Sequence, residues 1–235
     1  MSLFAMVREY SQDIYRNIRG IKVSQDLFDD LSEDPVNWAA ANELESHTHP
    51  ALINQSLIQR AFDYSKNDFI DYPFENITSS RYSDGSIACW YGSETLKTTI
   101  YETRYHFIQE IKDSWDIFQT QDRIIIDRRV GKIYCEGLGL DLTDKKEEYP
   151  WLVDPDNYTK CQETGRRVAH EGHPLLIVPS ARHAEGINLV VFNPNLLSNA
   201  REYCKLHYVF DVKKKKIQCF RGENEEVLKP STIDM

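Results

Sequence analysis

Residues 86–103 read SIACWYGSETLKTTIYET, a β-favouring run followed directly by a helical one. Residues 86–91 predict a strand because β-branched and aromatic side chains gather there. Ser93 stands where it can cap a helix, which we expect to continue to about Lys112. Apolar residues at helical spacing predict the buried face of this helix: Leu96, Ile100, Phe107 and Ile111.

Strands and helices also mix in the rest of the chain after residue 71. The pattern predicts strands at residues 123–127 and 132–135, joined by a turn at Gly131, and a long loop over 137–155. A helix is expected over 157–170 and ends at Gly172. Further strands are expected at 175–178, 187–192, 206–212 and 217–220, with a hairpin tip at 213–216. The fold class predicted is therefore α+β.

The first seventy residues have a different pattern. Five apolar residues recur at helical spacing and predict a helix that Gly20 ends: Leu3, Val7, Tyr10, Ile14 and Ile18. Further helices are expected from near Ser24, from Asp34 and after Pro50. The chain is thus divided into a helical N-terminal extension (1–70), a mixed domain (71–220) and a polar, frayed C-terminal tail (221–235).

Composition excludes several classes of protein. The 235 residues include 28 basic and 37 acidic side chains, for a net charge of −9, so a direct nucleic-acid partner is not expected. No apolar run approaches the roughly 18–20 residues that span a bilayer, so no membrane partner is expected either. Five cysteines without a Cys-x-x-Cys pair argue against a disulfide framework and a zinc ribbon. We expect a soluble, cytoplasmic protein.

The motifs of several common enzymes are missing. His170 and His173 are three residues apart and Gly172 breaks the helix between them, whereas a zincin needs two histidines four apart. Ser180 lacks the Gly-x-Ser-x-Gly elbow of serine hydrolases, and no glycine-rich phosphate loop occurs. No metal site is therefore predicted.

Three short segments remain, and they carry Arg81, Tyr91 and Glu102. In this order and spacing they resemble the RES family, which is named for its Arg, Glu and Ser. Ser180, in Pro-Ser-Ala after an apolar strand, supplies the serine. The segment NLVVFNP at residues 188–194 resembles the one that follows the serine in that family. The resemblance extends from about residue 70 to about residue 215.

The resemblance implies a fold similar to ADP-ribosyltransferases, with a split mixed β core that binds NAD as substrate and needs no metal. Arg81 would bind the pyrophosphate through its planar, charged fork. Tyr91 or Tyr82 would face the cationic nicotinamide ring. Glu102 would stabilise the oxocarbenium charge on the ribose. Ser180 would hydrogen-bond the nicotinamide ribose or amide.

Structural roles for the same residues stay open. Arg81 could pair with a surface carboxylate, and Glu102 could lie on the solvated side of its helix. Tyr82 and Tyr91 could pack in the core, and Ser180 could be a turn residue at the end of a strand.

The function that the resemblance implies is cleavage of the nicotinamide–ribose bond of NAD, with ADP-ribose passing to water or inorganic phosphate. Such a protein would be the toxin of a toxin–antitoxin pair, with an antitoxin protein as partner. The alternatives are a protein mono-ADP-ribosyltransferase, which shares the first half-reaction, and a non-catalytic protein-binding module. The sequence does not decide whether the protein forms a homo-oligomer.

Overall fold

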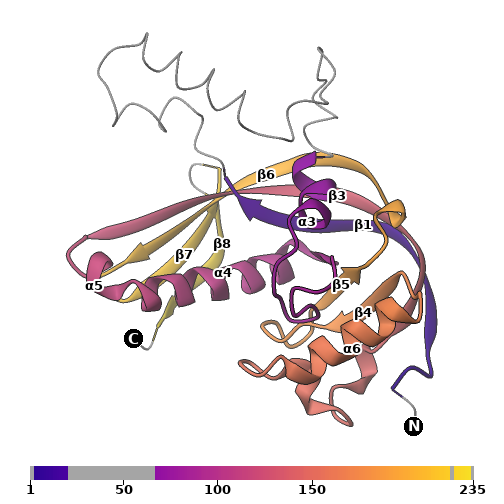
Figure 1. Cartoon of the computed structure of the whole chain (residues 1–235). Helices are drawn as coiled ribbons and strands as arrows, with labels where there is room; N and C mark the ends of the chain where they lie inside the picture. Colours follow the sequence, from indigo (N-terminus) through magenta and orange to yellow (C-terminus); the bar gives the residue numbers. More distant parts are fainter. Residues whose placement is uncertain (1–2, 21–66, 223–224, 234–235) are drawn as a thin grey trace, which may run out of the picture.

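The computed structural model describes residues 3–20, 67–222 and 225–233, and these residues form one mixed eight-stranded sheet. The strand order is β1-β2-β5-β4-β3-β6-β7-β8, and β1 also pairs with β3 (Figure 1). The strands are β1 (Val7–Arg19), β2 (Trp90–Ser93), β3 (Arg123–Asp141), β4 (Leu175–Pro179), β5 (Ile187–Val191), β6 (Leu197–Asp211), β7 (Lys216–Arg221) and β8 (Glu225–Thr232).

The 19-residue strand β3 divides the sheet into two halves. One edge of β3 pairs with β1 over the whole length of β1. The other edge pairs first with β6, over Arg123–Cys135, and then with β4 in parallel at Leu140 and Asp141. One half therefore consists of β6, β7 and β8, and the other of β4, β5 and β2. The single pair Tyr15↔Ser93 joins β2 back to β1.

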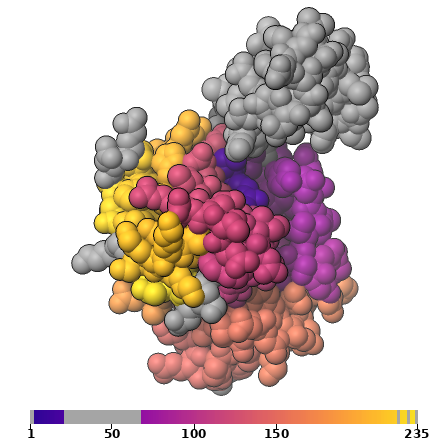
Figure 2. All heavy atoms as spheres, turned by 90° about the vertical axis from the view of Figure 1, so that its left-hand side faces the viewer, coloured from indigo at the N-terminus to yellow at the C-terminus, as the bar shows by residue number. Residues whose placement is uncertain are grey.

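One principal helix covers each half. The helix α4 (Leu96–Asp113) buries Ile100, Phe107 and Ile111 against β6, β7 and β8. The helix α6 (Thr159–His170) packs Cys161 and Val168 against the other half. Each large apolar side chain buried in this way contributes about 1.5–3 kcal/mol. Figure 2 shows α4 and α5 beside the C-terminal strands.

Short helical segments join these elements. They are η3 (Asn67–Asp71), α3 (Tyr72–Glu75), α5 (Trp115–Phe118), η4 (Thr143–Lys145), η5 (Pro150–Val153) and η6 (Pro194–Leu196). The α+β class predicted from the sequence is confirmed. So are the helices α4 and α6, the strands β4, β5 and β7, and the hairpin tip before β7. The side chain that caps α4 is Thr95, which accepts a hydrogen bond from the backbone N–H of Thr98, and not Ser93.

The helix predicted over the first twenty residues is wrong, because this segment is the strand β1. Tyr10, Ile14 and Ile18 are four residues apart, a spacing that puts side chains on one face of a strand as well as near one face of a helix. Pairing with β3 along the whole of β1 selects the strand. The other N-terminal helices and the boundary at residue 70 stay predictions, because residues 21–66 lie outside the described part of the chain.

The turn predicted at Gly131 is also wrong, because β3 runs through this residue without interruption. The glycine is needed there for space: a Cβ atom would lie 2.7 Å from Cδ1 of Phe69. The strand also includes residues 137–141, which the sequence assigned to a loop.

The C-terminal tail is not frayed, because Glu225–Thr232 forms β8 and pairs with β7. Leu228 and Ile233 are buried in the cluster that includes α4. The apolar residues of this segment, Val227, Leu228 and Ile233, do not alternate with polar ones, so the periodic signal was too weak to predict a strand.

Candidate functional site

A cavity of about 390 Å³ lies where β1, β2, α4 and the end of β4 meet. Four of the five residues predicted for the site line it: Arg81, Tyr82, Tyr91 and Glu102. The fifth, Ser180, does not line the cavity but is hydrogen-bonded to Glu102. One face of α4 supplies Thr99, Glu102, Thr103 and His106, which are spaced three and four residues apart.

Glu102 is held through a single carboxylate oxygen. The Ser180 hydroxyl donates to Oε1 at 2.5 Å, and the Asn188 amide nitrogen donates to the same oxygen at 2.6 Å. Within residues 3–20, 67–222 and 225–233, no hydrogen bond reaches Oε2. Charge-assisted bonds of this kind are short and strong, so they fix the carboxylate while leaving one oxygen available to a ligand.

Ser180 follows β4 and is 4% exposed. Its oxygen accepts hydrogen bonds from the backbone N–H groups of Arg182 (3.2 Å) and His183 (3.0 Å). Because a hydroxyl has one proton and two lone pairs, its hydrogen-bonding capacity is used completely. Ser180 therefore orients Glu102 in this structure.

Asn188 is a site residue to which the sequence analysis gave no role. It lies on β5 opposite Ser93 of β2, and the Ser93 hydroxyl donates to its side-chain oxygen at 2.7 Å. That bond turns the amide nitrogen toward Glu102. The signal was present, because Asn188 begins the segment that resembles the family and Ser93 stands between Tyr91 and Glu102.

Two arginines face the loop before α6. Arg81 donates to the carbonyl oxygen of Asp154 at 2.8 Å, and its guanidinium lies 4.3 Å from the centroid of the Tyr158 ring. Arg182 donates to the carbonyl oxygen of Pro155 at 2.5 Å and to the Tyr158 hydroxyl at 2.9 Å. Neither arginine forms an ion pair with a carboxylate of the described residues. Arg182 was not predicted, although it follows Ser180 by two residues.

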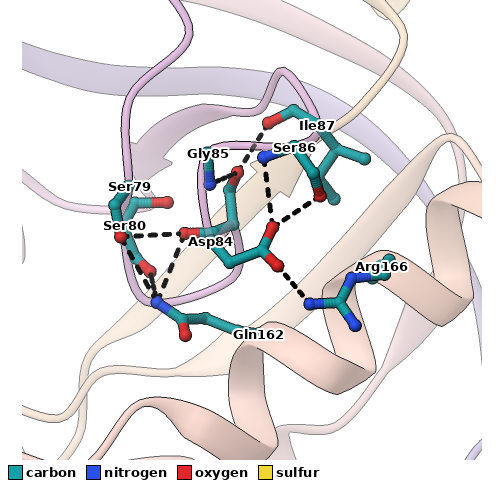
Figure 3. Close-up of polar contacts among 9 residues, drawn as sticks. Ser79, Ser80, Asp84, Gly85, Ser86, Ile87, Gln162 and Arg166 are labelled. Atoms are coloured by element: carbon teal, nitrogen blue, oxygen red, sulfur yellow. Dashed lines mark hydrogen bonds and ion pairs between the residues drawn. The ribbon is translucent and has the colours of Figure 1, made fainter.

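The loop that carries Arg81 is anchored to α6 (Figure 3). The Gln162 amide nitrogen donates to the carbonyl oxygen of Ser80 at 3.0 Å, and Arg166 forms an ion pair with Asp84. Asp84 also accepts hydrogen bonds from the backbone and hydroxyl of Ser86, which with Arg166 lower its pKa to about 2. These contacts hold Arg81 at the cavity without a regular strand around it.

Tyr91 and Tyr82 fix the same loop against β2. The Tyr91 hydroxyl accepts from the backbone N–H of Tyr82 at 2.7 Å and lies 2.9 Å from the Ser80 hydroxyl. Burial raises the pKa of Tyr91 well above its usual value. The Tyr82 side chain is completely buried in a core cluster with Leu140, so it packs in the core. Both tyrosines thus have structural contacts, and their roles toward a ligand stay predictions.

A match to the RES domain family covers residues 57–211, and the chain belongs to that family. A similar solved structure is the crystal structure of the M. tuberculosis MbcT–MbcA toxin–antitoxin complex. The identity is 12% and the TM-score 0.45, with 84% of this chain and 86% of that chain covered. No curated protein matches the chain in sequence.

The described residues contain neither a cluster of metal ligands nor a helix that could span a membrane. No group of three or more His, Cys, Asp or Glu side chains in the described residues could hold a metal ion. No helix among those residues is both long and apolar enough to cross a membrane.

Proposed function

We propose that this protein cleaves the nicotinamide–ribose bond of NAD and passes ADP-ribose to water or inorganic phosphate. The observation that carries the proposal is the Glu102 carboxylate, held through Oε1 by Ser180 and Asn188 with Oε2 unbonded, in a cavity lined by arginines. Membership of the RES family supports the same reaction.

The chemistry needs an anion beside the ribose. When the bond from ribose C1′ to the nicotinamide nitrogen breaks, its electron pair stays on the nitrogen and nicotinamide leaves neutral. Positive charge then develops on the ribose, and a fixed carboxylate stabilises it. Water adds to C1′ and loses a proton to solvent, or a phosphate oxygen adds instead. Oε2 of Glu102 is the atom available for this contact because Oε1 is already bonded twice.

Arg81 and Arg182 suit the pyrophosphate of NAD. Both guanidinium groups line the cavity, and their bonds go to neutral backbone carbonyls and the Tyr158 hydroxyl rather than to carboxylates. A doubly charged pyrophosphate forms stronger hydrogen bonds with arginine than a carbonyl does. It would therefore compete well for these donors.

The product distribution tests the reaction. Purified protein is incubated with NAD in phosphate and in a phosphate-free buffer, and nicotinamide and the ADP-ribose product are measured by chromatography. Free ADP-ribose in both buffers identifies a hydrolase, and a phosphorylated product in phosphate identifies a phosphorylase. Glu102→Gln is expected to nearly abolish nicotinamide release. Glu110→Gln is its matched control, because Glu110 lies two turns further along α4 in a surface ion pair with Arg19. Absence of nicotinamide in both buffers would contradict the proposal.

We further infer that the protein is the toxin of a toxin–antitoxin pair, held inactive by an antitoxin protein. RES family membership supports this inference. Expression of the chain alone is expected to lower cellular NAD and arrest growth, while Glu102→Gln expressed to the same level leaves both unchanged. Normal NAD and normal growth with soluble protein present would refute the toxin assignment.

A further inference from the structure

Arg16 lines the same cavity from the N-terminal strand β1, outside the region that matches the family. Its Nη1 donates to the carbonyl oxygen of Tyr91 at 2.9 Å, and its guanidinium lies 5.2 Å from the centroid of the Trp90 ring. Two contacts from β2 therefore fix the side chain at the cavity wall.

The remaining donors of Arg16 have no partner in the described residues. Among residues 3–20, 67–222 and 225–233, neither the buried Nε nor Nη2 has a hydrogen-bond acceptor. These two nitrogens share one edge of the guanidinium, the edge that binds an oxyanion through two parallel hydrogen bonds. A buried donor without an acceptor destabilises a protein, so an unfilled edge of this kind indicates a ligand.

Neighbouring arginines on β1 lie beside carboxylates. Arg8 Nε is also buried without a hydrogen bond, but it lies 3.2 Å from Oδ2 of Asp141. Arg8 of the same strand pairs with Glu94 and Asp141, and Arg19 pairs with Glu110. Arg16 forms no ion pair with any described carboxylate. Burial lowers the pKa of Arg16 to about 10, which still leaves it charged at neutral pH. The strand thus places one unneutralised cation at the cavity.

The charges of the cavity indicate the class of ligand. Three lining side chains are guanidinium groups (Arg16, Arg81 and Arg182), and the one lining carboxylate belongs to Glu102. Arg81 and Arg182 both contact the loop before α6, whereas Arg16 contacts β2. The excess positive charge therefore comes from two different walls of the cavity.

We propose that the Nε–Nη2 edge of Arg16 is an oxyanion subsite that binds a phosphate group, on a different wall of the cavity from Arg81 and Arg182. The phosphate would come either from the pyrophosphate of the dinucleotide or from free inorganic phosphate. The choice between these two sources rests on the proposed function, whereas binding of the oxyanion does not.

Direct titration tests the subsite without any turnover. Inorganic pyrophosphate and inorganic phosphate are titrated calorimetrically into the full-length wild type, Arg16→Met and Arg19→Met. Arg16→Met is expected to weaken binding of at least one of the two anions tenfold or more, and Arg19→Met to bind both as the wild type does. Wild-type affinity of Arg16→Met for both anions would overturn the subsite, and so would a wild type that binds neither.

A second variant covers a failure of Arg16→Met to fold, which circular dichroism would detect. Arg16→Lys keeps the positive charge but lacks the planar fork, so it is expected to bind the same anion several-fold more weakly than the wild type. Unchanged binding by a folded Arg16→Lys would then contradict the two-bond geometry on which the proposal rests.

Kinetics identify the source and separate this inference from the proposed function. A raised KM for NAD in Arg16→Met assigns the pyrophosphate, and a raised half-saturating phosphate concentration at unchanged KM for NAD assigns the acceptor. Arg16-dependent anion binding without NAD turnover would keep the subsite and reject the proposed function. NAD turnover together with anion binding that does not depend on Arg16 would keep the proposed function and reject the subsite.

Discussion

The Ser180 hydroxyl donates its single proton to Oε1 of Glu102 across 2.5 Å. Ser180 also accepts two backbone N–H bonds, so it cannot rotate away from Glu102 without losing them. The serine and the glutamate, 78 residues apart in the sequence, thus act as one unit. This relationship predicts that Ser180 acts through Glu102.

Ser180→Ala is expected to lower kcat for nicotinamide release by about 10- to 100-fold, because a hydrogen bond to a charged group contributes about 1.5–3 kcal/mol. KM for NAD should change little if the serine positions Glu102 and does not bind the substrate. Steady-state kinetics measure both constants, with the exposed Ser198→Ala as control. A large rise in KM at unchanged kcat would instead assign Ser180 to substrate binding.

Asn188→Asp puts a second carboxylate within hydrogen-bond distance of Glu102. Two like charges at this distance raise the pKa of one of them. We expect the acidic limb of the pH–rate profile to move to higher pH, whereas Asn188→Ala should lower kcat without that displacement. A profile of Asn188→Asp that overlays the wild type would contradict a contact between residue 188 and the catalytic carboxylate.

Arg166→Ala removes the ion pair that ties the Arg81 loop to α6. The loop keeps its bonds to Gln162, so we expect KM for NAD to rise several-fold while kcat stays within about twofold. Arg167→Ala is the matched control on the same helix, because Arg167 pairs with Glu171 away from that loop. Equal kinetics for the two variants would contradict a positioning role for Arg166.

Asp84 adds a pH dependence to folding. Hydrogen bonds from Ser86 and Arg166 lower its pKa in the folded protein to about 2, below the usual value of 3.8. Its contribution to stability is therefore present above about pH 4 and is lost as the pH falls toward 2. Urea unfolding at pH 6 and pH 3 should show a smaller loss of stability for Asp84→Asn than for the wild type. An equal loss in both proteins would mean that Asp84 is not linked to folding.

Local signals predicted the helices α4 and α6 and the buried strands β4 and β5. The helix α4 has an apolar face, and β4 and β5 have apolar runs. The more polar α6 has a clear end signal in Gly172, with its positive φ of 80°. The errors fall where long-range contacts determine the structure. Pairing with β3 makes residues 7–19 a strand, and the Phe69 ring occupies the space beside Gly131. Neither contact can be recognised from the residues that neighbour it in the sequence.

The residues of the candidate site also fall into two groups, those predicted from the sequence and those recognised only in the structure. Arg81, Tyr91, Glu102 and Ser180 were predicted because their order and spacing resemble a family pattern. Arg16 and Asn188 were not predicted, because their importance depends on which strands lie side by side. Arg182 was not predicted because its partners, Pro155 and Tyr158, are distant in the sequence. Asn188 reaches Glu102 only through the pairing of β5 with β2, and Arg16 reaches the cavity because β1 runs beside β2.

The central claim is that the Glu102 carboxylate drives cleavage of NAD. The most direct measurement is the rate of nicotinamide release at saturating NAD by wild type and Glu102→Gln, both shown to be folded by their thermal unfolding. The amide keeps the shape of the side chain but not its charge, so we predict a rate about 100- to 1000-fold lower, in line with the loss of one electrostatic contact to the transition state. Equal rates for the two proteins would contradict the claim.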